Sequence, residues 1–318
     1  MIHPIHWYTL LAAYVLDLVL GDPVSWPHPV VWMGRAITRL EPVFRRRIAS
    51  PFLAGLAFSL FLISGVWILG TGTVTLAMAV NPVLGECVQG TLLFFCLSGR
   101  TLEHAAVRVE SALGDHDLAR ARAEVSMIVG RDVTRLDETG VVKAAVETVA
   151  ENFVDGFVSP LFFAMIGGVP LALAYKMVNT LDSMVGYKNP LYILFGRASA
   201  RIDDAANFIP ARLGIMLAAL AAGLLGGMGT GLRALKTGFS EGSRHKSPNS
   251  GYPEATFAGA LAVRLGGANV YHGILVEKPF IGEGFPNPGP WAIRKACDLM
   301  LLACFLSVAA ALAVLSWM

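Results

Sequence analysis

Charged residues are scarce in this 318-residue chain. Asp, Glu, Lys and Arg make up 15% of it, whereas 55% of its residues are hydrophobic. A soluble domain carries roughly 25% charged and 45–50% apolar residues. Together with a mean hydropathy of +0.59, this composition indicates an integral membrane protein. The net charge is only +2 and no basic, aromatic-interleaved stripe is present, which argues against nucleic acid as a partner.

Motifs that mark several common enzyme classes are also missing. The chain has no GxxxxGK[ST], GxGxxG or HExxH segment, its seven histidines show no metal-ligand spacing, and it has no CxxC pair. We therefore expect no transition metal held by the protein. We expect free thiols, buried in or beside apolar segments, at Cys87, Cys96, Cys297 and Cys304. No cationic region precedes the first apolar stretch, so we expect no cleaved signal peptide.

Long apolar runs take the place of charge. They cover residues 5–20, 52–80, 83–97, 157–174, 213–228 and 299–317. A membrane-spanning helix needs about 20 apolar residues. The second run is long enough to tilt, or to break near Gly70 and Gly72, whereas the third and fourth are short enough to be re-entrant or merely buried. The pattern predicts an all-α, polytopic membrane helical bundle with about five or six spans.

Three more charged stretches separate the apolar runs, at residues 21–50, 100–152 and 231–295. The positive-inside rule places all three in the cytoplasm. It would also place the cations between Lys176 and Arg212 outside if the 157–174 run crossed the membrane. We therefore expect that run to be re-entrant or non-crossing.

We expect one integral membrane domain, 1–318, with three parts. These are a cytoplasmic helical stretch at 100–152, a polar site-bearing segment at 153–212 and a cytoplasmic loop and helix segment at 231–295. In the first part, Gly114 ends one helix and Asp115 can cap a second helix that stops at Gly130. A third helix follows from about Thr139.

Polar residues accumulate between Ala145 and Arg212, although apolar runs flank this region. A polar group that faces lipid or a dry core costs several kcal/mol unless it is paired or hydrated. Such a concentration is better explained by a functional site than by a scaffold.

The helix expected from about Thr139 carries three carboxylates on one side. Glu147, Glu151 and Asp155 follow at four-residue spacing, opposite a face of three valines (Val142, Val146, Val149) and Phe153. Stacked carboxylates repel one another by a few tenths of a kcal/mol per pair. Mg²⁺, which prefers one or two carboxylates plus substrate phosphate, would remove that repulsion. The alternative is a solvated face on which Lys143 pairs with Glu147.

Residues 175–187 form a second one-sided pattern. Read as a helix, they place Lys176, Asn179, Thr180, Ser183 and Tyr187 on one side, with Asp182 at its edge. Lys176 can hold a phosphate, and Asp182 can serve as a base or metal ligand. The alternative is a hydrogen-bonded seam between membrane helices.

Residues 197–212 form a third pattern. As one helix they align Arg197, Arg201, Asp204 and Arg212, with Asp203 and Asn207 beside them. Arginines suit carboxylates or phosphates. Internal Arg–Asp pairing explains the same residues equally well.

A turn-rich loop at 245–254 offers hydrogen-bond donors before a helical pattern. The donors are Lys246, Ser247, Asn249 and Ser250, and Pro253 suits the first helical turn. Such a loop at a helix N-terminus suits an anion, although it often only turns the chain. The Leu20–Pro23 and His28–Pro29 segments have the same two interpretations, and turn chemistry explains them more simply.

On these segments the chain resembles the membrane-bound adenosylcobinamide-phosphate synthase family of cobalamin biosynthesis, from about Asp17 to about Gly284. The matching segments, in family order, are LGDP (20–23), HP (28–29), GRDVTRLDE (130–138), AAVETVAEN (144–152), DG (155–156), SPLFFA (159–164), YKMVNTLDSMVGYKN (175–189), FGRASARIDDAANFIPAR (195–212), SPNSGYPEA (247–255), AGALAVRLGG (258–267) and EKPFIGEG (277–284). One departure is Phe153-Val154, where relatives often carry a hydroxyl residue after the Glu-Asn pair.

The resemblance implies a ligase. It would join (R)-1-amino-2-propanol, or its O-phosphate, to a peripheral carboxylate of adenosylcobyric acid through an amide bond. ATP, expected from the resemblance alone, and Mg²⁺ would serve as cofactors, and the cobalt belongs to the corrinoid substrate. The protein would lie in the cell (inner) membrane with its active site facing the cytoplasm. Its partners would be its substrates, lipid and later membrane enzymes of the pathway.

This reaction needs an activated acyl group, a base for the amine and stabilisation of an oxyanion. We expect catalytic roles for Glu147, Glu151, Asp182 and Lys176, and a Mg²⁺ site at Glu147, Glu151 and Asp155. The expected substrate-binding residues are Asn152, Asn179, Ser183, Tyr187, Arg201, Asp204, Arg212, Lys246, Ser247, Asn249 and Ser250. Apolar walls at the membrane boundary would hold the corrin ring.

Two other functions fit a polar segment at membrane depth. A transporter of a corrinoid or another small molecule uses broken polar helices, but no inverted repeat is visible and the 100–152 stretch is large for a loop. A non-catalytic scaffold that presents corrinoid to later enzymes is the other alternative.

Overall fold

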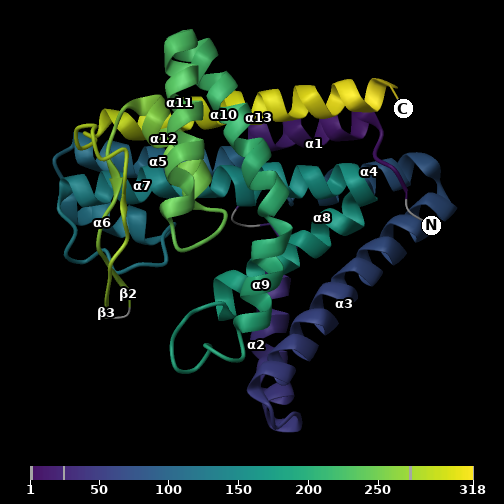
Figure 1. The fold of residues 1–318 in the computed structure, drawn as a ribbon. Coiled ribbons are helices and arrows are strands. Elements are labelled where there is room, and N and C mark those ends of the chain that lie inside the picture. The colour runs from purple at the N-terminus through teal and green to yellow at the C-terminus, as the bar shows by residue number, and fades with distance from the viewer. Residues whose placement is uncertain (1–2, 24–25, 272–273, 318) are drawn as a thin grey trace. The chain divides into compact units, whose positions relative to one another are not determined.

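The structure, a computed structural model, describes residues 3–23, 26–271 and 274–317. The α-helices are α1 (Trp7–Leu20), α2 (Pro29–Arg47), α3 (Pro51–Val80), α4 (Pro82–Phe94), α5 (Gly99–Gly114), α6 (Leu118–Ser126), α7 (Glu138–Phe153), α8 (Ser159–Val185), α9 (Arg197–Ala206), α10 (Phe208–Gly226), α11 (Met228–Glu241), α12 (Gly251–Leu261) and α13 (Trp291–Trp317) (Figure 1). A π-helical turn, η1 (Val154–Val158), separates α7 from α8, and a 3-10 turn, η2 (Gly242–Arg244), follows α11.

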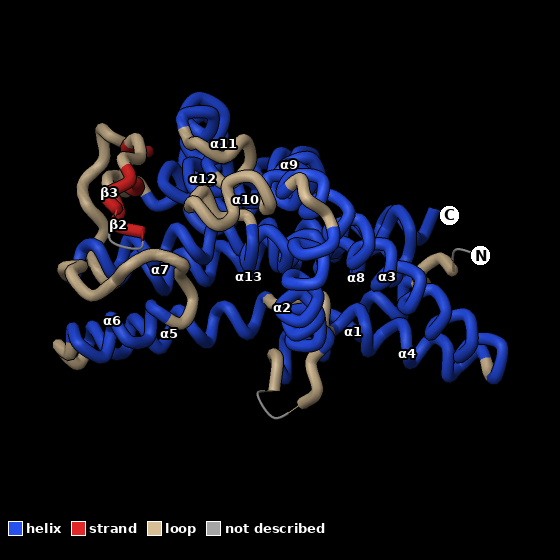
Figure 2. Tube along the Cα trace, turned by 90° about the horizontal axis from the view of Figure 1, so that it is seen from below, coloured by secondary structure: helices blue, strands red, loops and turns tan. Residues whose placement is uncertain are grey.

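The strands are short and confined to one segment of the chain, as Figure 2 shows. They are β1 (Leu265–Gly266), β2 (Asn269–Tyr271), β3 (Ile274–Val276) and β4 (Phe280–Ile281). β1 pairs with β4 and β2 pairs with β3, both antiparallel. The predicted all-α membrane architecture is confirmed.

Five helical segments of the described chain are long and apolar enough to cross a membrane. They are Pro51–Val80, Pro82–Gly114, Glu138–Val185, Phe208–Gly226 and Trp291–Trp317. α1 is apolar but has only 14 residues. Of the two alternatives for the 52–80 run, a tilted helix or a break near Gly70 and Gly72, the break is excluded because α3 is continuous over 30 residues. The Ser50 cap and Pro51 in the first turn start a helix that is hydrophobic all round, as suits a membrane span.

The chain packs as two compact units. Unit 1 comprises Met1–Ser98, Asp155–Asn207 and Ala310–Met318, and unit 2 comprises Gly99–Val154 and Phe208–Ala309. Two of these junctions nearly coincide with the start of the charged stretch at 100 and the start of the polar segment at 153.

Unit 1 is built around α3, which contacts α2, α4, α8 and α9. One contact is made by backbone. A Cβ on Gly55 would lie 1.8 Å from the carbonyl oxygen of Phe195, so only glycine allows α3 to approach the chain there. Beside this contact, the buried Oγ atoms of Ser59 and Ser199 lie 2.9 Å apart and hydrogen-bond.

The apolar run predicted at 157–174 forms part of a broken helix. Within α8, Gly167 and Gly168 leave helical geometry, and Gly168 has φ +71°. A Cβ at Gly168 would lie 2.6 Å from the carbonyl oxygen of His3. Pro170 follows and cannot donate the helical hydrogen bond. The interruption agrees with the expected irregular element, and whether it crosses the membrane stays a prediction.

In unit 2, α11 packs against both α10 and α12, and α7 contacts α5, α6, α12 and β1. Asp137 caps α7 by accepting the Gly140 N–H at 2.7 Å. The expected cap at Asp115 is wrong. Asp117 caps α6, whereas Asp115 pairs with Arg120 at 2.9 Å, and α6 ends at Ser126 rather than at Gly130.

The 197–212 segment is not one helix, contrary to the expectation. α9 ends at Ala206 and α10 begins at Phe208. Asn207, between them, uses its side chain to bind Asp203 and Ser159. Arg197 and Arg201 therefore belong to unit 1 and Arg212 to unit 2.

Candidate functional site

The carboxylate pattern of α7 leads to a buried ionic cluster in unit 2. Glu147 is only 4% exposed. Its Oε2 accepts from Arg131 at 2.5 Å, and its Oε1 accepts from the Gly266 N–H at 2.7 Å. The alternative of a solvated face with a Lys143 pair is therefore wrong. The Lys143 ammonium instead lies 5.3 Å from the centre of the Phe280 ring.

Gly266 holds Glu147 from the strand β1 because its backbone is left-handed, with φ +72°. A Cβ there would lie 2.3 Å from the carbonyl oxygen of Pro279. Glycine permits this close approach and so aims its N–H at the carboxylate.

A cavity of about 90 Å³ opens beside Glu147. It is lined by Ile128, Val129, Gly130, Arg131, Glu147, Thr148, Glu151, Asn152, Glu254 and Lys278. Three carboxylates thus face the same space as one arginine and one lysine. The cavity is too small for a nucleotide or a corrin, which need several hundred Å³. It can take a cation, an ammonium or one phosphate group.

The cluster holds more carboxyl groups than cationic side chains. Glu147, Glu151 and Glu254 would contribute three negative charges when ionised, against two positive charges from Arg131 and Lys278. Glu254, in the first turn of α12, is 3% exposed. Burial raises its pKa well above the ordinary range, and the negative charges of Glu147 and Glu151 raise it further. An added cation would relieve this imbalance.

His245, at the end of η2, stays neutral near this cluster. Burial lowers its pKa to about 4, and the positive charge of Lys278 lowers it further. Its Nδ1 accepts the Ser247 N–H at 3.0 Å and lies 3.1 Å from Ser250 Oγ. It therefore organises the loop and adds no charge at neutral pH.

The carboxylates at the cavity differ in part from the expected Mg²⁺ ligands, because Glu254 lines it with Glu147 and Glu151. Across the described ranges 3–23, 26–271 and 274–317, no three His, Cys, Asp or Glu side chains group as metal ligands. Both oxygens of Glu147 already accept hydrogen bonds, whereas Glu151 and Glu254 line the cavity. A Mg²⁺ ion takes one or two carboxylates and completes its shell with water and substrate phosphate. Glu151 and Glu254 fit this role, and the role expected of Asp155 stays a prediction.

A second polar cluster lies in unit 1, around Lys176 on α8. Lys176 is 9% exposed and interacts electrostatically with Cys96, Asp22 and Asp155. Asn179, one turn further, donates to Asp155 Oδ2 at 3.4 Å. The Leu20–Pro23 and His28–Pro29 segments turn the chain, since Gly21 ends α1 and His28 caps α2. They also bring Asp22 towards Lys176.

A hydrogen-bonded network connects α8 to the end of α9 within unit 1. The Oδ1 of buried Asn207 accepts from Ser159 Oγ at 2.6 Å and from Tyr175 Oη at 2.9 Å. Its Nδ2 donates to Asp203 at 3.0 Å. Phe163 stacks on the Tyr175 ring with centroids 5.1 Å apart. This network has the character of the helix seam that was the alternative for this segment.

Arg212, predicted to bind phosphate, contacts the loop that was predicted to do the same. Its guanidinium donates to Asn249 Oδ1 at 3.0 Å and to the Pro248 carbonyl at 3.2 Å. It also stacks over the Phe208 and Tyr252 rings. The structure thus brings Arg212 and Asn249 together. Phosphate binding by this pair stays a prediction.

The other predicted substrate residues are dispersed. Ser183, Tyr187, Arg201 and Lys246 are exposed, and Asp204 is half-buried, with its pKa raised by burial. Ser247 accepts the N–H groups of Asn249 and Ser250, so it closes the loop on itself. Asn152 lines the cavity and donates to the Thr148 carbonyl at 3.1 Å. The α8 residue Asp182 is half-buried, and its role as a base stays a prediction.

The sequence reasoning missed four cluster members: Arg131, Glu254, Gly266 and Lys278. All four lie in segments quoted for the family resemblance, GRDVTRLDE, SPNSGYPEA, AGALAVRLGG and EKPFIGEG. The signal was a charged residue or a glycine inside each long matching segment. Phe153 and Val154, where the chain departs from the family pattern, are both buried. The centre of the Phe153 ring lies 6.2 Å from that of Phe257.

Comparison with known proteins gives a consistent result. Residues 10–300 match the family model described as CobD/Cbib protein. The chain is 46% identical to the cobalamin biosynthesis protein CobD of Klebsiella pneumoniae, over 98% of both chains. It is 44% identical to the cobalamin biosynthesis protein CbiB of Salmonella arizonae, again over 98% of both chains. No solved structure matches the chain. The chain therefore belongs to the CobD/Cbib family.

Proposed function

We propose that this chain acts in cobalamin biosynthesis, as the names of its relatives indicate for them. We propose further that it is the ligase that joins (R)-1-amino-2-propanol, or its O-phosphate, to a peripheral carboxylate of adenosylcobyric acid. The observation that carries this proposal is the buried cluster of Glu147, Glu151, Glu254, Arg131 and Lys278 around one small cavity. Amide formation from an anionic carboxylate and a cationic amine needs groups of both signs in one place.

Each side chain of the cluster then has a distinct task. Arg131 and Gly266 fix Glu147, so that this carboxylate is a rigid negative wall of the cavity. Glu151 and Glu254 would receive the cation, which is either the substrate ammonium or Mg²⁺. Burial raises the pKa of Glu254, so this carboxyl group holds a proton more readily than an exposed one and can donate or exchange it at the reacting groups.

The two cations of the cluster would act on the acyl side of the reaction. Lys278 and Arg131 are the two cationic side chains in the cavity lining. They can therefore stabilise a phosphate or a developing oxyanion there. Glu151 and Glu254 would hold Mg²⁺, and ATP would supply the phosphoryl group that activates the corrinoid carboxylate, with ADP as the leaving group.

The polar residues of unit 1 keep their predicted roles. Phosphate binding by Lys176 and substrate binding by Asn179 stay predictions about unit 1. The five helical segments able to cross a membrane support a multi-pass membrane protein. We place it in the cell (inner) membrane with the cavity facing the cytoplasm, where the substrates and ATP are available.

The test uses the full-length protein, purified in detergent, with adenosylcobyric acid, aminopropanol phosphate or aminopropanol, and Mg²⁺-ATP. Each component is omitted in turn, and the products are weighed by mass spectrometry. The expected product is the amide, formed only in the complete mixture. Absence of product, together with uptake of labelled corrinoid into vesicles without ATP or amine, would make the protein a transporter.

A further inference from the structure

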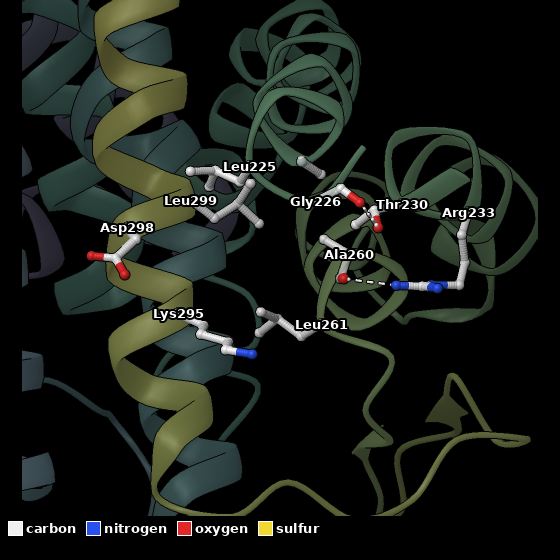
Figure 3. A pocket seen from close by; sticks show the side chains of 10 residues that line it. Leu225, Gly226, Thr230, Arg233, Ala260, Leu261, Lys295, Asp298 and Leu299 are labelled. Atoms are coloured by element: carbon white, nitrogen blue, oxygen red, sulfur yellow. Dashed lines mark hydrogen bonds between the residues drawn. The ribbon is translucent and has the colours of Figure 1, made fainter. Parts of the chain in front are cut away.

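A larger cavity lies elsewhere in unit 2 and has no part in the proposed reaction. It has a volume of about 400 Å³ and is formed by the helices α10, α11, α12 and α13. Figure 3 shows its lining, which consists of Ala222, Leu225, Gly226, Thr230, Arg233, Ala260, Leu261, Lys295, Asp298 and Leu299. It meets the C-terminal end of α12, whereas Glu254 of the carboxylate cluster is in the first turn of that helix.

The wall of this cavity is mostly apolar and carries one cation that reaches into it. Lys295 extends from α13 towards Leu261 (Figure 3). Its ammonium lies 4.9 Å from the centre of the Trp291 ring, and it forms no ion pair among the described residues. Asp298, one turn further along α13, also lines the cavity, and its carboxylate extends away from Lys295 in Figure 3.

The second cation of the wall is partly engaged. Arg233 Nε donates to the Gly259 carbonyl at 2.6 Å, and its Nη2 donates to the Ala260 carbonyl at 3.1 Å. These bonds satisfy the carbonyls at the end of α12. Arg233 therefore adds positive charge at a fixed place, and Lys295 is the group that can move to meet a ligand.

The residues at the start of α13 suit a membrane interface. α13 begins at Trp291, which is 46% exposed, and ends at Trp317. Tryptophan marks both boundaries of membrane helices, and 27 helical residues span about 40 Å. Lys295 is one turn inside Trp291, where headgroups meet hydrocarbon, and Leu299 is one turn deeper.

The helices that close the cavity also expose apolar side chains. α10 and α11 run across the direction of α13 (Figures 1 and 3). Their shared turn exposes apolar side chains, with Leu224, Leu225 and Met228 each more than half exposed. An apolar turn beside a headgroup-level lysine is suited to the boundary of a bilayer.

We propose that this cavity binds one membrane phospholipid with a net anionic headgroup. Its phosphate would pair with Lys295 near Arg233, and its acyl chains would leave along Leu225 and Leu299 into the bilayer. Basic pockets between membrane helices bind anionic headgroups in this way. The mostly apolar wall of the cavity does not suit a free nucleotide. The proposal is independent of the reaction catalysed at the carboxylate cluster.

The test is native mass spectrometry of the detergent-purified full-length protein titrated with phosphatidylglycerol or, in parallel, phosphatidylcholine. We expect one phosphatidylglycerol molecule to be retained preferentially. Lys295→Gln should weaken its binding about fivefold, the effect of one cation near an anionic headgroup. Lys236→Gln, which removes an exposed lysine of α11 outside the cavity, is the matched control and should bind as the wild type does.

A second variant separates the cavity from general charge attraction. Leu299→Phe fills the apolar wall and leaves both cations in place, so it should also weaken retention of phosphatidylglycerol. Equal retention by the wild type and both cavity variants would overturn the proposal. Displacement of the lipid by an equal concentration of inorganic phosphate would also overturn it, because the occupant would then be a free phosphate.

Discussion

The Asn207 hydrogen-bond network of unit 1 and the carboxylate cluster of unit 2 differ in how their polar groups are paired. In unit 1, Tyr175, Ser159 and Asp203 share the hydrogen bonds of Asn207, mostly between neutral groups. In unit 2, three glutamates face two cations around a cavity. The first arrangement pairs its groups largely with one another, whereas the second holds one more carboxyl group than cations, so one carboxyl group must keep a proton or receive an added cation. Polar residues among apolar helices therefore indicate a site when their acidic and basic groups are unequal in number. They indicate helix–helix packing when they hydrogen-bond mainly to one another.

The largest expected effect is the loss of the buried ion pair in unit 2. Arg131→Ala leaves Glu147 buried without its counter-ion, which costs about 3–5 kcal/mol for such a pair. Both side chains are less than a tenth exposed. We expect a large fall in the thermal midpoint of unfolding in detergent. Arg135→Ala, an exposed neighbour, is the control. An unchanged midpoint in Arg131→Ala would show that unit 2 does not depend on this buried ion pair, and the contrast with unit 1 would be lost.

The second prediction concerns the role of the buried Lys176 in unit 1. If it holds a phosphate, Lys176→Met should lower the rate of amide formation roughly 100-fold, as loss of one charge-stabilising donor does. Stability should hold or rise, because a buried charge is removed. Lys188→Met, at an exposed position, serves as the control. A lower unfolding midpoint with unchanged activity would assign Lys176 to the seam.

The packing of unit 1 should be sensitive to one methyl group. Gly55→Ala places a Cβ against the Phe195 carbonyl and should cost about 1–3 kcal/mol through overpacking. Gly65→Ala, in the same helix, meets nothing within 4 Å and should be neutral. The measurement is the unfolding midpoint of both variants. Equal midpoints would show that α3 does not depend on this backbone contact.

The smallest effect is a pH dependence of stability that originates in Glu254. Its pKa is raised above the ordinary value of 4.5, so the folded state keeps a proton that the unfolded state releases. Stability is then lost as the pH rises above 4.5 towards the raised pKa, by at most about 1.4 kcal/mol per pH unit. Without added Mg²⁺, Glu254→Gln should flatten this slope, and exposed Glu277→Gln should not. Equal slopes in all three proteins would contradict the buried charge imbalance.

The sequence predicted local structure well wherever one chemical signal dominated. Apolar length located the membrane helices, and Gly114 and Pro253 marked the end of α5 and the first turn of α12. It was wrong where a cap depended on tertiary contacts. Asp115 and Asp117 are equally good caps by composition, but Asp115 pairs with Arg120 in the folded chain.

The sequence predicted only some of the residues of the candidate site. Helical periodicity identified Glu147 and Glu151, because their spacing is encoded within one helix. It does not report which distant segments meet that face. Arg131, Glu254 and Lys278 reach it from a turn, from α12 and from the loop before β4, and no local period relates them to α7. The helix at 197–212 failed for a similar reason, since Asn207 binds side chains that periodicity does not show.

The most direct measurement is the rate of amide formation by purified Glu151→Gln and Glu254→Gln proteins, each shown to be folded by its unfolding midpoint. Glu277→Gln serves as the exposed control. If the chemistry occurs at the unit 2 cavity, both cavity variants should lose at least roughly 100-fold in rate, and the control should keep the wild-type rate. Wild-type rates in both folded cavity variants would contradict the assignment of the reaction to this cluster.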